Sequence, residues 1–182
     1  MLIDVGAHTI DLLLWWLGEV ADVQYEDDAM GGIETNCRLR LTMTSGAKGV
    51  VQLSRDWPLP NRYGIECEKG WIAYVCDVVD RVEWGLHDSD YGLNAEIRMM
   101  AANPRPGMRD LGPAVPGFMD CFLAQLRNVV GAILGAESLQ VSGVDARKSV
   151  ALIEKCYQKR TLLEMPSLDE AELRRAKELA NG

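Results

Sequence analysis

A change in hydrophobic period along the first quarter of the chain constrains the fold most strongly. From about Val5 to Leu17, apolar residues recur at the three- and four-residue spacing of a helix with one buried face. Between residues 37 and 43 the period becomes two, which predicts a strand with one buried and one polar face. The buried positions would be Ile10, Leu13, Leu14 and Leu17 in the helix and Cys37, Leu39, Leu41 and Met43 in the strand. The two patterns together indicate a helix packed on a sheet.

The remaining strands and helices are predicted in separate runs. Ser45-Gly46 is a turn that returns the chain into a second strand over residues 48–55, so the pair forms a hairpin. Further strands are predicted over residues 21–27, 62–68, 71–76, 81–86 and 93–100. A segment rich in proline and glycine, residues 103–116, then leads to a helix over 118–134. A further helix starts behind Ser142, whose hydroxyl can cap its free amides.

This order predicts an α+β fold, with an open, mainly antiparallel sheet and helices packed on one face. We expect a single domain over residues 1–166, followed by a charged helical tail over 167–182. The uncovered sheet face would carry Arg38, Arg40 and Gln52, and, depending on register, some of Trp57, Trp71, Val75 and Trp84. Aromatic and arginine side chains on an uncovered sheet are typical of subunit interfaces, so a homodimer through this face is predicted.

Composition excludes several classes of protein. The 182 residues carry a formal net charge of −8, which argues against nucleic acid or an anionic membrane as partner. The longest apolar run, Leu12–Leu17, is too short to span a bilayer, and the first residues lack a basic signal-peptide region. Five cysteines, an odd number without C-x-x-C spacing, argue against disulfides and a zinc ribbon. We therefore expect a cytoplasmic protein whose cysteines are small core residues.

The second face of the first helix carries side chains that could take part in catalysis or substrate binding. If the helix is regular, Asp4, His8, Asp11 and Trp15 lie along this face. A carboxylate four residues before an imidazole can accept its ring N–H and raise its pKa, as in a proton-transfer histidine. Spacing alone also allows simpler interpretations. His8 could be a structural histidine whose ring N–H bonds to Asp4 or Asp11, Asp4 could be the N-cap of the helix, and Asp11 could be a solvated carboxylate.

The pattern D-x-G-x-H-x-x-D, followed by an apolar helix and Gly18-Glu19-Val20, resembles the start of the catalytic half of the Gfo/Idh/MocA oxidoreductases. The run from Val141 to Ala146, followed by the helix that ends near Tyr157, resembles that family's last long helix and its tyrosine. The resemblance implies a fold like the C-terminal domain of glyceraldehyde-3-phosphate dehydrogenase. It also implies an NAD(P)-dependent dehydrogenase acting on a sugar, polyol or related hydroxy compound. His8 and Asp4 would then be catalytic, and Asp11 and Tyr157 would bind substrate or support the groups that do.

The sequence departs from the family in lacking the Rossmann G-x-G-x-x-G motif and the E-K-P motif with its lysine. We therefore expect the substrate-binding and oligomerisation half of a longer enzyme, which would work with an N-terminal Rossmann domain. NAD or NADP would be bound by the complete enzyme and not by this chain alone. The competing hypothesis is a non-catalytic dimerisation or binding module derived from the same family.

Three further interpretations were weighed against this assignment. Asp4, His8 and Asp11 supply metal-ligand types, but a single helix provides only part of the convergence that a metal requires, so no metal site is predicted. Residues 87–90, His-Asp-Ser-Asp, lack the glycine and glutamate of a calcium loop and are predicted to form a solvated turn. Tyr157 is better explained as a helix-packing tyrosine, with its hydroxyl at the rim, than as a proton donor.

Overall fold

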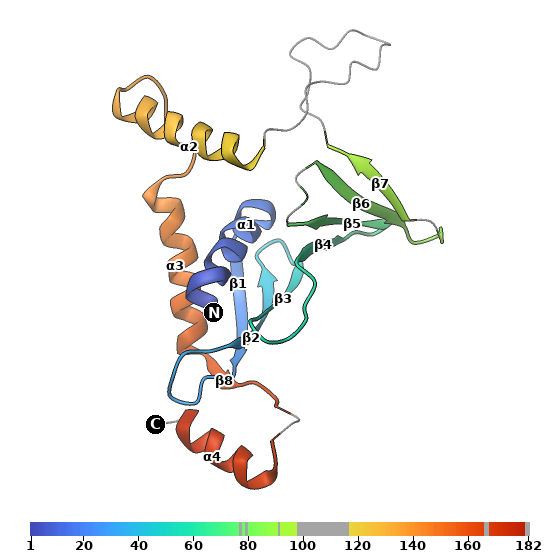
Figure 1. The fold of residues 1–182 in the computed structure, drawn as a ribbon, viewed down its shortest axis with the longest axis vertical. Helices are drawn as coiled ribbons and strands as arrows, with labels where there is room; N and C mark the ends of the chain where they lie inside the picture. The colour runs from blue at the N-terminus through green and yellow to red at the C-terminus, as the bar shows by residue number, and fades with distance from the viewer. Residues whose placement is uncertain (77, 79, 91, 98–116, 166–167, 181–182) are drawn as a thin grey trace. The chain divides into compact units, whose positions relative to one another are not determined.

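The computed structural model describes residues 1–76, 78, 80–90, 92–97, 117–165 and 168–180 (Figure 1). It confirms the predicted α+β class, and the strands are divided between two four-stranded sheets. One compact unit comprises residues 1–59 and 141–182, and a second comprises residues 60–140. The single domain over residues 1–166 and the tail over 167–182 stay predictions. The predicted crossover of residues 103–116 and the end of the predicted strand at 98–100 lie outside the described residues.

The sheet of the first unit has the order β3-β2-β1-β8. Its strands are β1 (Val20–Asp27), β2 (Asn36–Met43), β3 (Lys48–Ser54) and β8 (Arg160–Leu162). β2 pairs antiparallel with both β1 and β3, and Gly46, at φ 88°, supplies the left-handed residue of the predicted hairpin turn. β8 pairs parallel with β1 and was not predicted, because a three-residue strand is too short to show an alternating pattern.

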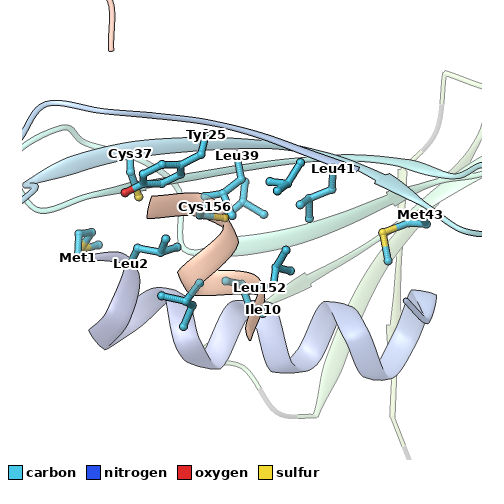
Figure 2. Packing of buried hydrophobic residues seen from close by; sticks show 13 residues of the cluster. Met1, Leu2, Ile10, Tyr25, Cys37, Leu39, Leu41, Met43, Leu152 and Cys156 are labelled. Carbon is cyan, nitrogen blue, oxygen red and sulfur yellow. The ribbon is translucent and has the colours of Figure 1, made fainter. Parts of the chain in front are cut away.

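Two helices cover one face of this sheet, as predicted. They are α1 (Ala7–Leu17) and α3 (Gly143–Gln158), and Figure 2 shows the apolar side chains that fill the space between them and the strands. The shared core contains Leu2, Ile10, Val23, Tyr25, Cys37, Leu39, Leu41, Met43, Leu152, Ile153 and Cys156. Leu13, Leu14 and Leu17 of the predicted stripe pack against this core while remaining partly exposed. The opposite face is polar, with Arg38 and Arg40 both close to Glu26.

The ends of the two helices follow their local sequence. α1 ends at Gly18, whose φ of 83° is a left-handed conformation that favours glycine. α3 begins with a capping box in which the Asp145 amide donates to the Ser142 hydroxyl and the Ser142 amide donates to the Asp145 carboxylate. The predicted cap at Ser142 is therefore confirmed. Ahead of α1, residues Leu2–Gly6 form a π-helical turn, η1.

The second unit contains an antiparallel meander of four consecutive strands. These are β4 (Arg62–Glu66), β5 (Gly70–Val75), β6 (Arg81–Leu86) and β7 (Gly92–Glu96). The unit also includes the helix α2 (Phe118–Ile133). Gly70 is required by the approach of two strands, because a β-carbon there would lie 2.2 Å from the carbonyl oxygen of Gly85.

The register of this meander separates two of the three candidate interface tryptophans, Trp71 and Trp84. Trp84 lies opposite Ile72 and Leu93, and residues opposite each other share a face of a sheet. By the same alternation, one face carries Tyr63, Ile65, Ile72, Tyr74, Val82, Trp84, Leu86 and Leu93. Trp71 belongs to the opposite face, where its ring fills the space beside Gly85.

The chain continues from β8 to the helix α4 (Glu170–Ala180), within the segment predicted as a helical tail. Asp169 caps this helix by accepting hydrogen bonds from the amides of Ala171 and Glu172. No helix in the described ranges is long and apolar enough to cross a membrane.

The five cysteines are reduced, and only Cys37 and Cys156 are buried. The prediction that every cysteine is a core residue is wrong for Cys67 and Cys121, which are exposed. Period-two alternation identifies the buried face of a strand, but neither cysteine lies in a strand. Cys67 follows β4 and Cys121 lies on an exposed turn of α2, so neither side chain enters a core.

Candidate functional site

The polar face of η1 and α1 is exposed to solvent, as predicted. Asp4, His8, Asp11 and Trp15 are exposed, and Trp15 is 80% exposed. On the other side of the same helix, Thr9 and Ile10 are buried. The segment therefore combines a structural face with an accessible polar face, as a substrate-binding surface requires.

Asp4 is paired with a residue that the sequence did not indicate. Its Oδ2 lies 2.5 Å from Nη2 of Arg55, and both side chains are more than half exposed. Arg55 comes directly after β3 and reaches across to η1. The only signal in the sequence was a cation at the end of a predicted strand, which does not identify its partner.

The predicted hydrogen bond between Asp4 and His8 is not formed, and this correction has a local cause. Asp4 lies in a π-helical turn, whose i→i+5 hydrogen bonding changes the relation between residues four apart that a regular α-helix would give. Asp4 is not the N-cap of α1 either, since that position is Gly6 and has no side-chain cap. Within the described part of the chain, the side chain of His8 makes no hydrogen bond or ion pair.

Gly6, the glycine of the D-x-G-x-H pattern, sits where the turn meets the core. A β-carbon at this position would lie 2.8 Å from Cδ1 of Leu2 and 2.9 Å from Cδ1 of Leu53. Any other residue would have to displace both leucine side chains. The glycine thus allows η1 to pack closely against the end of β3.

Asp11 connects the first helix to the last long helix. The Ser149 hydroxyl donates a hydrogen bond of 3.1 Å to Oδ1 of Asp11, so α1 and α3 are joined by a polar contact beside their apolar one. Asp11 is therefore an exposed carboxylate with one hydrogen-bond partner on the neighbouring helix. Its role at the substrate stays a prediction.

Tyr157 joins the last turn of α3 to a buried carboxylate. Its hydroxyl donates a 2.8 Å hydrogen bond to Oε1 of Glu34, which lies in the loop between β1 and β2 and is 5% exposed. The same oxygen accepts a 2.8 Å hydrogen bond from the amide of Leu2, and the Met1 amino group lies 3.1 Å away. Sequence reasoning missed Glu34, because a lone glutamate after two glycines is typical of a solvated loop.

Arg160 completes a cluster of polar side chains around Tyr157. Its Nε lies 2.7 Å from Oδ2 of Asp27, which is fully buried, and its Nη2 lies 3.8 Å from Oε2 of Glu34. The guanidinium carbon sits 5.1 Å from the centre of the Tyr157 ring, a cation–π contact. The cluster comprises Tyr25, Asp27 and Glu34, which are buried, and Tyr157 and Arg160, which are partly exposed.

The protonation states in this cluster follow from burial and hydrogen bonding. Burial, and then the hydrogen bond to Glu34, raise the pKa of Tyr157 above its usual value of 10.0. Burial by itself would raise the pKa of Glu34, but hydrogen bonds from backbone amides and from Tyr157 hold it below 4.5. At neutral pH, Tyr157 is therefore a neutral donor and Glu34 a charged acceptor.

Neither candidate cation site, the Asp4, His8 and Asp11 set or the turn of residues 87–90, has a metal-binding arrangement. Among the described residues, no group of three His, Cys, Asp or Glu side chains is close enough to hold a metal ion. In the turn of residues 87–90, Nε2 of His87 instead lies 3.0 Å from Oε1 of Glu66. This turn is exposed, as predicted.

The comparison with protein families identifies the segment that carries the exposed polar face. Residues 1–73 match the family model described as GFO/IDH/MocA C-terminal domain. This match confirms the resemblance that the sequence suggested, over the residues that it covers. No curated protein matches the chain.

Solved structures share the fold at low sequence identity. Aldose-aldose oxidoreductase from Caulobacter crescentus is 22% identical with a TM-score of 0.62, over 87% of this chain and 44% of its own. The WlbA dehydrogenase from Bordetella pertussis, solved with NADH and UDP-GlcNAcA, is 21% identical with a TM-score of 0.61, over 87% of this chain and 43% of its own. KijD10, a 3-ketoreductase from Actinomadura kijaniata solved with TDP-benzene and NADP, is 15% identical with a TM-score of 0.65, over 91% and 48%. The chain spans less than half the length of each.

Proposed function

We propose that this chain is the substrate-binding and oligomerisation half of an NAD(P)-dependent oxidoreductase that acts on a sugar, polyol or related hydroxy compound. The observation that carries this proposal is the exposed set of Asp4, His8 and Asp11 within a segment that matches the GFO/IDH/MocA C-terminal domain. The nucleotide-sugar ligand named for the WlbA dehydrogenase supports a carbohydrate-like substrate.

In this proposal, the residues of the chain position the substrate and move its proton. His8 faces solvent and has a ring nitrogen available to a substrate hydroxyl, as general acid/base or as a hydrogen-bond partner that orients it. Asp4, held by Arg55, offers carboxylate oxygens that accept hydrogen bonds from further hydroxyls. The nicotinamide, when bound by the complete enzyme, supplies the hydride chemistry at the carbinol carbon.

The N-termini of α2, α3 and α4 are unsuited to holding the pyrophosphate of a dinucleotide. Pyrophosphate binds at a helix N-terminus whose amides are free and follow a glycine-rich loop. The first turns of α2, α3 and α4 instead contain Asp120, Asp145 and Glu170, and no described strand enters a helix through a G-x-G-x-x-G loop. We therefore place the cofactor on a separate Rossmann domain, whose lysine would assist His8.

We expect the 182-residue chain by itself to show no binding of NAD(H) or NADP(H). The acidic first turns of α2 and α3 repel a pyrophosphate, and no strand among the described residues leads into a helix through a G-x-G-x-x-G loop. Isothermal titration calorimetry with each nucleotide tests this directly. Binding at low micromolar concentration would reveal a cofactor site in this chain and would contradict the division of roles.

We also expect the chain to be a homodimer joined through the Trp84 face of the second sheet. This face gathers aromatic and aliphatic side chains, and Ile72, Leu86 and Leu93 on it are exposed at 39%, 51% and 49%. A contiguous apolar patch is costly to leave in water and is buried when two copies pair by two-fold symmetry. Light scattering should therefore shift toward the monomer mass for Trp84→Glu.

Trp71→Glu is the matched control for the dimer, because Trp71 lies on the opposite face of the same sheet. We expect this variant to retain the dimer mass, and circular dichroism should show that both variants are folded. A monomeric wild type at tens of micromolar, or a dimer that survives Trp84→Glu, would show that the interface lies elsewhere.

The alternative function, a non-catalytic dimerisation or binding module, has one observation in its favour. The Asp4 carboxylate is engaged by Arg55 and makes no hydrogen bond to His8, so no preassembled acid–base pair is present. Replacement of His8 in the complete enzyme separates the two functions. A Rossmann half encoded next to this chain would favour the oxidoreductase.

A further inference from the structure

We propose that Glu34 and Tyr157 are positioning residues that hold η1, and with it Asp4, in place for the reaction. This inference rests on the proposed function, in which Asp4 and His8 contact the substrate. Glu34 and Tyr157 are 123 residues apart in the chain, yet their side chains meet below the turn that starts the D-x-G-x-H pattern.

Glu34 supplies a hydrogen-bond acceptor to the amide of Leu2, the first residue of η1. The first amides of any helix have no partner within the helix and require acceptors from outside it. The Leu2 amide, in a residue that is fully buried, donates to Oε1 of Glu34 at 2.8 Å. A buried carboxylate is costly unless it is hydrogen-bonded or paired, so its position below this amide ties the turn to the β1–β2 loop.

Tyr157 in turn fixes the carboxylate of Glu34. Its hydroxyl donates to the same Oε1 at 2.8 Å, while its ring is held between two neighbours. The Tyr25 ring meets it edge-on, with centroids 5.8 Å apart and planes at 88°, and the Arg160 guanidinium contacts it from 5.1 Å. A side chain restrained in this way loses little further freedom when it forms the hydrogen bond.

The backbone of η1 connects Leu2, which Glu34 binds, to Asp4. The amides of Asp4 and Gly6 both donate to the carbonyl oxygen of Met1, at 3.3 and 3.2 Å. Asp4 is only two residues beyond Leu2, and Gly6 leads directly into α1 and His8. Loss of the Glu34 contact would therefore loosen the segment that carries Asp4, while α3 and the sheet keep their own packing.

The first experiment measures the turn without any need for turnover. Tyr157→Phe keeps every ring contact and removes only the hydroxyl. Amide hydrogen exchange of the 182-residue chain, resolved by residue with NMR, should become about fivefold faster at residues 2–6, the scale of one lost hydrogen bond. Exchange within β2 and α3 should not change. Glu34→Gln, which loses the charge but keeps an acceptor, should have an effect of the same direction.

Thr161→Val is the matched control for these variants. It removes one hydroxyl from β8, where Thr161 donates a 3.0 Å hydrogen bond to the carbonyl of Tyr25, and it leaves Glu34 untouched. We expect no faster exchange at residues 2–6. Unchanged exchange in Tyr157→Phe, or equally faster exchange in Thr161→Val, would overturn the inference.

The second experiment measures kcat and KM in the complete enzyme. Tyr157→Phe should lower kcat about fivefold, the scale of one lost hydrogen bond in the transition state, and leave the KM for the nucleotide unchanged, whereas Thr161→Val should alter neither. If Tyr157→Phe exchanged faster but kept its kcat, while His8→Ala inactivated the enzyme, the positioning role would be refuted and the proposed function would stand. Full turnover in His8→Ala would refute the proposed role of His8 at the substrate, and with it the role of the turn in catalysis.

Discussion

His8→Ala in the complete enzyme is expected to lower turnover by roughly 10²-fold or more, the usual contribution of a positioned proton-transfer group. The loss should fall on kcat, because His8 would interact with the hydroxyl whose proton moves in the transition state. Folding should not suffer, since the side chain of His8 is exposed and makes no hydrogen bond or ion pair in the described part of the chain. Steady-state kinetics together with thermal unfolding would measure both quantities.

The other histidine of the chain provides the control for this variant. His87 lies in an exposed turn of the second unit, where it contacts Glu66, and has no proposed part in the reaction. His87→Ala should therefore keep full turnover. If His8→Ala also kept it, His8 would be removed from the mechanism. A His8→Ala protein that failed to fold would instead show that the histidine is structural.

Arg160→Leu is expected to lower the free energy of unfolding of the first unit by about 3 kcal/mol, the lower end of the range for breaking a buried ion pair. The variant leaves Asp27, whose side chain is 1% exposed, without its cation. The lower end applies because Arg160 itself is 29% exposed, so that water partly screens the pair. Urea unfolding followed by circular dichroism would measure the change.

Arg40→Leu tests whether burial is the cause of this effect. Arg40 forms an ion pair of the same length, 2.7 Å, with Glu26, but on the exposed face of the same sheet. Arg40→Leu should lower the free energy of unfolding by less than about 1 kcal/mol. Adding Asp27→Asn to Arg160→Leu should recover part of the lost stability, because the unpaired charge is removed. Equal losses in Arg160→Leu and Arg40→Leu would contradict the importance of the buried pair.

Local patterns in the sequence predicted the elements of this fold well. The strands β1, β2, β3 and β6 lie within one residue of their predicted limits, because each alternates between apolar and polar residues over several positions. The cap at Ser142 was predictable because a capping box involves only residues three apart. The exposed face of α1 was predictable for the same reason, since helical spacing alone separates His8 from Ile10.

Contacts between distant segments were beyond any local pattern. Arg55 as the partner of Asp4, and Glu34 as the partner of Tyr157, are separated from them by 51 and 123 residues. The spacing instead suggested Asp4 as the hydrogen-bond partner of His8. That expectation depended on a regular α-helix, whereas the chain forms a π-helical turn at Asp4. The three-residue strand β8 exists only because β1 is there to pair with it.

The sequence by itself determined the α+β class, the order of the elements, and the polar face with Asp4, His8 and Asp11, because hydrophobic period and capping act over a few residues. The tertiary structure alone decided that the strands form two sheets, that Trp71 and Trp84 lie on opposite faces, and that the buried Glu34 and Asp27 meet the partly exposed Arg160. Strand register and the burial of charge depend on which distant segments meet. A carboxylate becomes part of a core only where the folded chain brings it donors and a cation, and no run of neighbouring residues specifies that meeting.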